Sequence, residues 1–535
     1  MYRRPSPGQL SFADFYLPFG GQLSGDNRWV KLAELVPWEE FDATYAEQLS
    51  PSQGAPAKSF RLALGALIIK EKLGLSDEET VHQVRENPYL QYFLGFHEYR
   101  DEAPFEASMM THFRKRLSGE LLSAVNQRVV AAVLVETVGD SPAPEEEDNP
   151  NGGGGPGAKT AESLEAEPSD DEPEVPHQGR LLLDATVAPA DIRYPTDLDL
   201  LHQARASSER ILDRLYQTMA TPPAKKPRTY RQKARRTYLT VAKQRRPSAR
   251  VRRKAVGQQL RYLRRNLKHI DTLLATGASL SDLTPYWYRR LLVIHEVYRQ
   301  QWQMYQQRQR RIDHRIVRLS QPHVRPIVRG KAGTPVEFGA KIALSCVSGY
   351  ALLDRLDWQA FNESTDLVEQ VERYRERFGC YPVSVHVDQL YRTRDNRAWC
   401  QAHGIRLSGP PLGRPKASEK TALTTQARED AAIRNGVEGK FGQAKRRFGL
   451  ARIKAKLATT AETSLAMTVL VMNLEQRLRA LILFFGRLVL SLGGGLERSV
   501  ESWLKWAISL TLTHFLPEGR LFQQAPSRGT GKSST

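Results

Sequence analysis

The stretch Leu181-Leu-Leu-Asp184-Ala-Thr-Val-Ala188 is a short apolar run interrupted by one carboxylate. Runs of this length and composition are typical of buried β-strands. A second run, Tyr381-Pro-Val-Ser-Val-His-Val-Asp388, ends in another carboxylate. A carboxylate inside a sheet is costly to bury unless it is paired or binds a metal ion. If the two strands are neighbours, both carboxylates emerge at the same edge of the sheet, and the sequence predicts a site there.

Further strands and helices follow the first of these runs. Residues 335–347 and 350–358 are apolar segments on either side of Gly349, which predicts a β-hairpin. Residues 365–378 place their apolar side chains on one helical face. Helical patterns dominate from Ala427 onward. This order of strand, hairpin, helix, strand and helix predicts an α/β fold with one central mixed sheet.

A third carboxylate lies on a predicted helix. Arg434 and Glu438 are one helical turn apart, and Lys445 follows two turns later, so all three share a face. A carboxylate between two cations suits a site for metal and phosphate, because the acid can hold the metal while the cations bind phosphate oxygens. The alternative is a solvated ion-pair stripe. For Asp184 and Asp388, the alternative is a turn or capping residue at a strand end.

Composition excludes several classes of protein. The 535 residues carry 78 Lys and Arg against 59 Asp and Glu, a formal net charge of +19, which predicts a polyanionic partner. Three cysteines form no C-x-x-C pair, which argues against a disulfide framework and a cysteine zinc site. We expect no secretory signal, and the most apolar stretch, residues 480–492, is too short to span a bilayer. The composition predicts a cytosolic protein.

Charge is spread unevenly along the chain. Residues 140–174 contain 12 acidic residues and one lysine, which predicts a disordered acidic linker over residues 139–178. Residues 225–268 contain 18 Lys or Arg and no acidic residue. We expect this basic tract to contact DNA backbones through Arg252, Arg253, Arg264 and Arg265. The alternative is a solvated, disordered loop.

These features predict six regions. Residues 1–138 form a helical domain, either a helix-turn-helix DNA-binding domain or a plain helical bundle with a basic face. A catalytic core of residues 179–200 and 323–460 is interrupted by an insertion, residues 201–322. The insertion combines the basic arm with an antiparallel helical hairpin formed by residues 258–274 and 285–319. C-terminal helices over residues 461–523 and a disordered tail over residues 524–535 complete the chain.

The order of the three acids, two on strands and one on a helix, fits a ribonuclease-H-like site. On these residues the chain resembles DDE transposases of bacterial insertion sequences, in the IS-four/IS-five-like superclass. That superclass carries a Y-x2-R-x3-E-x6-K signature, and this chain matches it at Arg434, Glu438 and Lys445. The tyrosine position is Ala431, a departure from the signature.

The resemblance implies a mechanism and a set of residues. Asp184, Asp388 and Glu438 would be the catalytic residues and would hold two Mg²⁺ ions, for which Mn²⁺ can substitute. The reaction would cut DNA at the element ends and join the freed 3′-hydroxyls to target DNA, within a homodimer that pairs two ends. Arg434 and Lys445 would clamp the scissile phosphate. DNA contacts are also expected from four loop cations, with solvated loop charges as the alternative: Arg392, Arg394, Arg414 and Lys416.

Two other functions remain open at this stage. One is a catalytically inactive DNA-binding relic that keeps the fold and the basic arm. The other is a ribonuclease-H-like nuclease that cuts without strand transfer.

Overall fold

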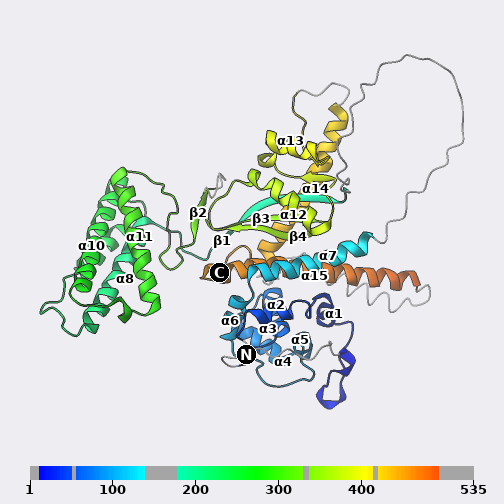
Figure 1. The fold of residues 1–535 in the computed structure, drawn as a ribbon, viewed down its shortest axis with the longest axis horizontal. Helices are drawn as coiled ribbons and strands as arrows, with labels where there is room; N and C mark the ends of the chain where they lie inside the picture. Colours follow the sequence, from blue (N-terminus) through cyan, green and yellow to red (C-terminus); the bar gives the residue numbers. More distant parts are fainter. Residues whose placement is uncertain (1–10, 51–55, 139–176, 329–335, 414–419, 493–535) are drawn as a thin grey trace, which may run out of the picture. The chain divides into compact units, whose positions relative to one another are not determined.

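The computed structural model of the chain describes residues 11–50, 56–138, 177–328, 336–413 and 420–492 (Figure 1). The chain divides into two compact units, Met1–Asn473 and Leu474–Thr535. The acidic linker expected at residues 139–178 lies outside the described residues except at its last two positions. Four other parts of the sequence predictions also lie outside the described residues: Arg414, Lys416, residues 493–523 of the C-terminal helices and the tail at residues 524–535.

The N-terminal region is helical, as the sequence predicts. Serines cap two of its helices: the side chain of Ser59 accepts from the Leu62 N–H and that of Ser76 from the Glu79 N–H. The helix Met109–Arg116 ends in three basic residues, and its Arg114 forms a two-point ion pair with Asp77, so part of this basic charge is neutralised within the domain. The helices are α1 (Arg28–Leu35), α2 (Asp42–Glu47), α3 (Phe60–Leu73), α4 (Asp77–Glu86), α5 (Pro88–Phe93), α6 (Met109–Arg116) and α7 (Gly119–Val138).

The central sheet is mixed, which confirms the predicted α/β class. Its strands lie in the order β2-β3-β1-β5-β6, and β4 also pairs with β3. Strand β1 is antiparallel to β3 and parallel to β5. The β3–β4 hairpin turns through Ser348 and Gly349, which have φ of 49° and 82°, as tight hairpin turns require. The strands are β1 (Arg180–Pro189), β2 (Arg325–Val328), β3 (Val336–Val347), β4 (Tyr350–Asp357), β5 (Ser384–His386) and β6 (Arg406–Leu407).

Helices pack against both faces of β1. Leu181 and Leu183 are fully buried in one hydrophobic cluster with Leu367 and Val371 of α12 (Leu367–Phe378). Leu182 points the other way, because side chains alternate along a strand. On that face it lies under α14 (Lys420–Arg447), so closely that a Cβ at Gly436 would be 3.4 Å from its side chain. The sheet thus brings α14, with the third acid, over the strand that carries the first.

The remaining helices of the core follow β5 and α14. Helix α13 (Arg394–Ala402) separates β5 from β6, and α15 (Ala458–Leu492) ends the described chain. Asn473 is the last residue of the first unit. Its side chain accepts a hydrogen bond from the Ala351 N–H and donates one to the Asn126 side chain. Asn126 also donates to the Ala351 carbonyl, so α7 and β4 are joined by a buried polar contact.

The insertion is a bundle of four α-helices, where the sequence analysis predicted a two-helix hairpin. They are α8 (Asp197–Thr218), α9 (Arg231–Ala242), α10 (Ala249–Ala275) and α11 (Pro285–Gln307). Helix α8 begins inside the segment assigned to the core, and its leucines share one buried cluster with those of α10 and α11. Helix α11 ends at Gln307 rather than near Leu319, because Arg308 adopts the left-handed conformation.

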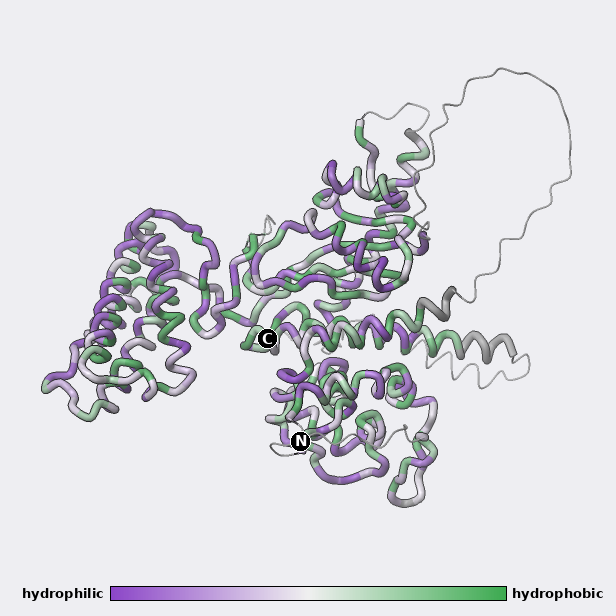
Figure 2. Tube along the Cα trace, in the orientation of Figure 1, coloured by the Kyte–Doolittle hydropathy of each residue, from purple (hydrophilic) through white to green (hydrophobic). Residues whose placement is uncertain are grey.

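Hydrophobic and hydrophilic residues alternate along the helices of this bundle (Figure 2), and the buried hydrophobic side chains form one cluster. The basic tract is largely helical, because α9 and most of α10 lie within it. The alternative of a disordered loop is therefore wrong for this tract. Among the described residues, no helix has the length and apolar character needed to cross a membrane.

Candidate active site

Asp184 and Asp388 lie at corresponding positions of two neighbouring strands. In the parallel β1–β5 pair, Leu182 is opposite His386, so each aspartate follows two residues beyond this pair. The Asp184 carboxylate accepts from the Ala185 N–H at 2.8 Å. The Asp388 carboxylate caps the short helix Gln389–Tyr391 and accepts from the Gln389 N–H at 2.6 Å. The predicted meeting of the two strand acids at one edge is therefore present.

Helix α14 brings Glu438 to the same edge through Arg434. One guanidinium nitrogen of Arg434 is 3.1 Å from Glu438 Oε1, and the other is 3.8 Å from Asp388 Oδ1. Both carboxylate side chains are about half exposed, at 50% each, so they are open to solvent and to a ligand. A single guanidinium therefore links the second and third acids predicted from the sequence.

Asp184 is the most buried of the three acids. Burial raises the pKa of its carboxyl to about 6. The negative charges of Glu363 and Asp388 also act to raise that pKa, while the Ala185 N–H and the positive charge of Arg434 oppose the increase. A carboxyl that is buried beside two other carboxylates favours a cation as its neighbour, which is the electrostatic condition of a metal-binding or catalytic site.

Lys445, the second cation of the predicted stripe, reaches β1. Its ammonium group donates to Thr186 Oγ1 at 2.9 Å. Thr186 is buried and lies two residues after Asp184, on the same side of the strand. Arg434 and Lys445 therefore approach the sheet on either side of Glu438. This agrees with the prediction that all three side chains share one face of the helix.

A divalent metal fits the chemistry of these side chains, because Asp184, Asp388 and Glu438 offer only hard oxygen ligands. Among the described residues, however, no three His, Cys, Asp or Glu side chains lie close enough together to hold one ion. In this arrangement the Arg434 guanidinium is the cation between Asp388 and Glu438.

A fourth carboxylate near Asp184 was missed by the sequence analysis. Glu363 lies in the short helix Glu363–Thr365 and pairs with Lys341 of β3 at 2.8 Å, with both side chains largely buried. Its charge acts on the Asp184 carboxyl more strongly than that of Asp388 does. The loop after β4 carries no periodic pattern, so no sequence signal placed Glu363 near β1.

A buried polar cluster that the sequence analysis did not single out fixes α14 to the sheet. Asp430 of α14 accepts two hydrogen bonds from Arg406 of β6, at 2.9 and 3.1 Å. It also accepts from the Gly409 N–H and lies 3.4 Å from the ring of His386, which is fully buried in β5. Asp430 is one helical turn before Arg434, so this cluster sets the position of the helix where it passes Asp388.

The predicted loop cations have different environments. Arg392 donates to the Val387 carbonyl and packs against Gly409, which gives it a structural role beside Asp388. Arg394 is exposed at the start of α13. Ala431, at the signature tyrosine position, is exposed on α14 just before the turn that carries Arg434.

The four predicted arginines of the basic tract also differ. Arg252 and Arg253 are exposed at the start of α10. Arg264 lies over the Trp302 ring at 5.8 Å, and Arg265 lies over the Tyr230 ring at 4.5 Å, so these two guanidinium groups take part in cation–π contacts of the bundle.

Comparison with known proteins finds two matching family models and one similar protein. Residues 385–475 match the family described as "Transposase DDE domain", and residues 18–116 match a "Transposase domain" family, DUF772. These matches define a transposase. The chain is also 34% identical over 175 residues to an uncharacterized protein, ORF8 of the nfe locus of Rhizobium meliloti, covering 33% of this chain and 68% of that protein. No solved structure matches the chain.

The chain belongs to the DDE transposases of bacterial insertion sequences, which confirms the resemblance found in its sequence. Membership implies an enzyme of DNA transposition that binds DNA, and the family generally uses divalent metal ions. The DDE match contains Asp388, Arg434, Glu438 and Lys445, whereas Asp184 lies before it.

Proposed function

We propose that this protein cuts DNA at the ends of its insertion sequence and joins the freed 3′-hydroxyls to target DNA. The proposed core is ribonuclease-H-like, formed by residues 179–200 and 323–460, with residues 1–138 as a DNA-binding domain. Support comes from the family membership and from two acids on adjacent strands with a third on a helix packed over them.

The single observation that carries the proposal is the bridging position of Arg434. Its guanidinium contacts both Asp388 and Glu438, so two acids from distant segments of the chain meet at the sheet edge that also holds Asp184. Three carboxylates and two cations at one edge match the needs of phosphoryl transfer, in which negative charge must be both bound and stabilised.

Each residue has a proposed role. Asp184, Asp388 and Glu438 would hold two Mg²⁺ ions, or Mn²⁺ in their place. Bound metal would supply activation of a water or 3′-hydroxyl and stabilisation of the leaving oxygen. Arg434 and Lys445 would orient the scissile phosphate by charge-assisted hydrogen bonds. No side-chain nucleophile is required.

The test is a cleavage and joining assay with purified protein, Mg²⁺ or Mn²⁺, and DNA bearing the element ends. We expect D184N, D388N and E438Q each to abolish cleavage and to leave DNA binding largely intact. E429Q is a matched control, because Glu429 is exposed on the same helix as Glu438 and more than two turns before it. Normal cleavage by the three variants, or loss of cleavage in E429Q as well, would overturn the assignment.

The same assay separates the two other functions. A protein that binds the ends and cleaves nothing is an inactive relic, and one that cleaves without joining is a nuclease of the same fold.

We also propose a homodimer, because two ends must be brought together, and a cytoplasmic, nucleoid-associated location. Chemical cross-linking with and without end DNA measures directly whether the protein forms this homodimer.

A further inference from the structure

The insertion contains a cleft of about 850 Å³ outside the candidate active site. Its walls come from the segment between β1 and α8, the end of α9, the start of α10 and the end of α11 with the residues that follow. We call it the arginine cleft, because six exposed arginines line it: Arg193, Arg245, Arg252, Arg253, Arg308 and Arg310.

The charge of the arginine cleft is not balanced within it. Its lining includes two acidic residues, Asp197 and Asp199. Asp197 is bound by a seventh lining arginine, Arg315, and by Gln301, whereas Asp199 accepts from Tyr238 and Gln203. Both carboxylates are therefore engaged in the wall and do not neutralise the six exposed guanidinium groups.

None of the six guanidinium groups pairs with a carboxylate of the described residues; Arg252 and Arg253 donate to backbone carbonyls instead. In the described part of the chain, no carboxylate forms an ion pair with Arg193, Arg245, Arg308 or Arg310. Their mutual repulsion disfavours the empty cleft, and an anion would relieve it. Of these four, Arg245 alone belongs to the basic tract of residues 225–268, so the folded insertion gathers arginines from three separate segments of the chain.

The arginine cleft also has aromatic walls. Tyr194 is 72% exposed, with its ring edge-on to Phe338 of β3 at 5.5 Å. Tyr305 of α11 carries the guanidinium of Arg253 over its ring at 4.3 Å, and Arg253 also donates to the Tyr305 carbonyl. Exposed aromatic rings among arginines are the combination that binds nucleic-acid strands, since phosphates meet the cations and bases can stack on the rings.

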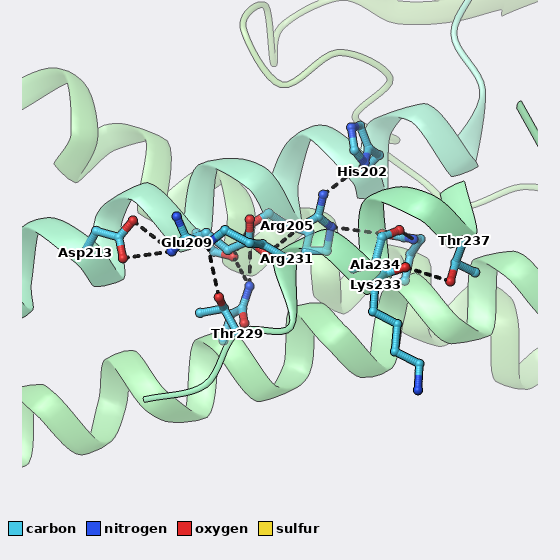
Figure 3. Close-up of polar contacts among 12 residues, drawn as sticks. His202, Arg205, Glu209, Asp213, Thr229, Arg231, Lys233, Ala234 and Thr237 are labelled. Atoms are coloured by element: carbon cyan, nitrogen blue, oxygen red, sulfur yellow. Dashed lines mark hydrogen bonds and ion pairs between the residues drawn. The ribbon is translucent and has the colours of Figure 1, made fainter. Parts of the chain in front are cut away.

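Buried polar contacts hold the walls in place. Arg205 of α8 is almost fully buried between Glu209, Gln259 and His202 (Figure 3). Gln259 in turn donates to the Ala234 carbonyl of α9. At the start of α9, Arg231 donates to both oxygens of Asp213 at 2.9 Å. Near the end of α9, the ring of Tyr238 stacks on that of His202 at 3.8 Å.

These contacts mean that the wall formed by α9 is fixed by packing and not by a bound ligand. A wall that is already ordered adds little backbone-ordering cost when a polyanion binds. The α9 wall of the arginine cleft therefore needs no rearrangement to receive a ligand.

From the unpaired arginines, the exposed ring and the fixed walls, we propose that the arginine cleft is a second DNA-binding site, which holds a phosphodiester backbone without reading its sequence. This inference rests on the proposed function only for the choice of DNA as the polyanion. The recognising chemistry is a row of phosphates, so a free nucleotide is the other source to be distinguished.

The experiment compares two triple variants of the full chain. R193Q/R245Q/R310Q removes three cleft charges whose side chains make no ion pair with a described residue. R210Q/R214Q/R289Q removes three exposed charges from α8 and α11, outside both the cleft and the basic tract. Binding of a fluorescent DNA duplex of unrelated sequence is measured by anisotropy from low to moderate salt, with circular dichroism as a check that both variants fold.

We expect the cleft variant to lose at least tenfold in affinity and to lower the slope of log affinity against log salt by about 2–3, as the loss of three phosphate contacts requires. The outside variant should change the affinity less than threefold. Equal losses in the two variants would overturn the cleft as a site. If millimolar ATP binds to the wild type and not to the cleft variant, while both bind the duplex equally well, the ligand of the cleft is a nucleotide and not a DNA backbone.

The catalytic proposal is tested separately in the same preparations. If the wild type binds DNA through the cleft and D184N cleaves like the wild type, the proposed function fails and the cleft stands. If cleavage depends on Asp184 and the two triple variants bind alike, the function stands and the cleft fails.

Discussion

The guanidinium of Arg434 lies between two acids, 3.1 Å from Glu438 and 3.8 Å from Asp388. It neutralises part of the negative charge at the sheet edge, and the proposed function also assigns it the binding of a phosphate. These two roles make opposite demands on a substitution at this position, because removing the positive charge favours a metal cation and disfavours a phosphate.

We therefore expect R434Q to bind Mg²⁺ or Mn²⁺ more tightly than the wild type and still to cleave DNA at least ~100-fold more slowly. Metal binding is measured by the increase in thermal midpoint on titration, and cleavage by the assay described above. R446Q is the control, because Arg446 is exposed on the same helix. Weaker metal binding in R434Q would mean that Arg434 orders the carboxylates rather than competing with the ion.

Asp184 predicts a pH dependence of stability. Its pKa is raised to about 6, above the ordinary value of 3.8, because burial disfavours the charged form. The folded state therefore binds the proton more tightly than the unfolded state, and stability falls as the pH rises from about 4 through about 6. Above that window the charged carboxylate lowers the free energy of unfolding by up to about 3 kcal/mol.

D184N removes this charge with little change in shape. In metal-free buffer we expect the variant to melt several degrees above the wild type at pH 7.5 and at the same temperature at pH 4, as followed by differential scanning calorimetry. E429Q should melt with the wild type at both pH values. A gain that is as large at pH 4 as at pH 7.5 would show that the ionisation of Asp184 is not its source.

The contact between Lys445 and Thr186 predicts a positioning effect. Thr186 is buried, and its hydroxyl accepts from the Lys445 ammonium at 2.9 Å. T186V keeps the shape of the side chain and removes the acceptor, so Lys445 loses one constraint on its direction. We expect the rate of cleavage under saturating DNA to fall about tenfold while the DNA affinity stays within about twofold.

T186S is the matched control, since it restores the hydroxyl. Rescue of the cleavage rate by serine, and not by valine, would separate positioning from packing. If T186V cleaves at the wild-type rate, the contact has no part in the reaction.

The strands and the third acid could be predicted because their signals are local. Two apolar runs that carry aspartates predicted both strands, and the spacing of Arg434, Glu438 and Lys445 predicted one helix face. The sequence predicted a shared site only if the two strands were neighbours. The structure pairs β1 with β5 in parallel, so this condition is met. The identity of the site residues as catalytic stays a prediction.

What the sequence could not provide is contact between distant segments. Asp430 is buried by Arg406 and His386 from two strands, and nothing in its own helix distinguishes it from an exposed acid. Helix α8 was overlooked because its apolar positions acquire meaning only against α10 and α11. The arginine cleft gathers residues from three segments, so only its basic-tract portion was visible in the sequence.

The Asp430 cluster predicts a stability effect that is separate from catalysis. Burial acts to raise the pKa of Asp430, but the hydrogen bonds and charge of Arg406 outweigh burial, so this pKa lies below its ordinary value. D430N removes the anion from Arg406, whose side chain is 42% exposed, so water compensates part of the loss and the cost should be about 1.5–3 kcal/mol. Because the folded-state pKa is lowered, the stabilisation by Asp430 is present above the unfolded-state value and is lost as the pH falls through the folded-state value.

We expect D430N to lower the thermal midpoint at pH 7 and to approach the wild type near pH 3. Hydrogen exchange should locate the loss in α14 and β6. The exposed neighbour supplies the comparison, since E429Q should change neither measurement. Unchanged exchange in α14 would mean that the cluster does not hold this helix on the sheet.

The buried pair of Arg205 and Glu209 predicts strong coupling within the insertion. Arg205 is 2% exposed and Glu209 6%, and Arg205 also donates to Gln259 at 3.1 Å. Either R205M or E209L alone leaves one charge buried without its partner, which should destabilise the bundle by about 3–5 kcal/mol, whereas the double variant should recover much of that loss. Hydrogen exchange of α8 to α10 measures the stability of each of the four proteins in this double-mutant cycle.

Because α9 forms a wall of the arginine cleft, the single variants should also weaken DNA binding, and the double variant should restore it in part. Additive losses, with no recovery in the double variant, would show that the two side chains act independently.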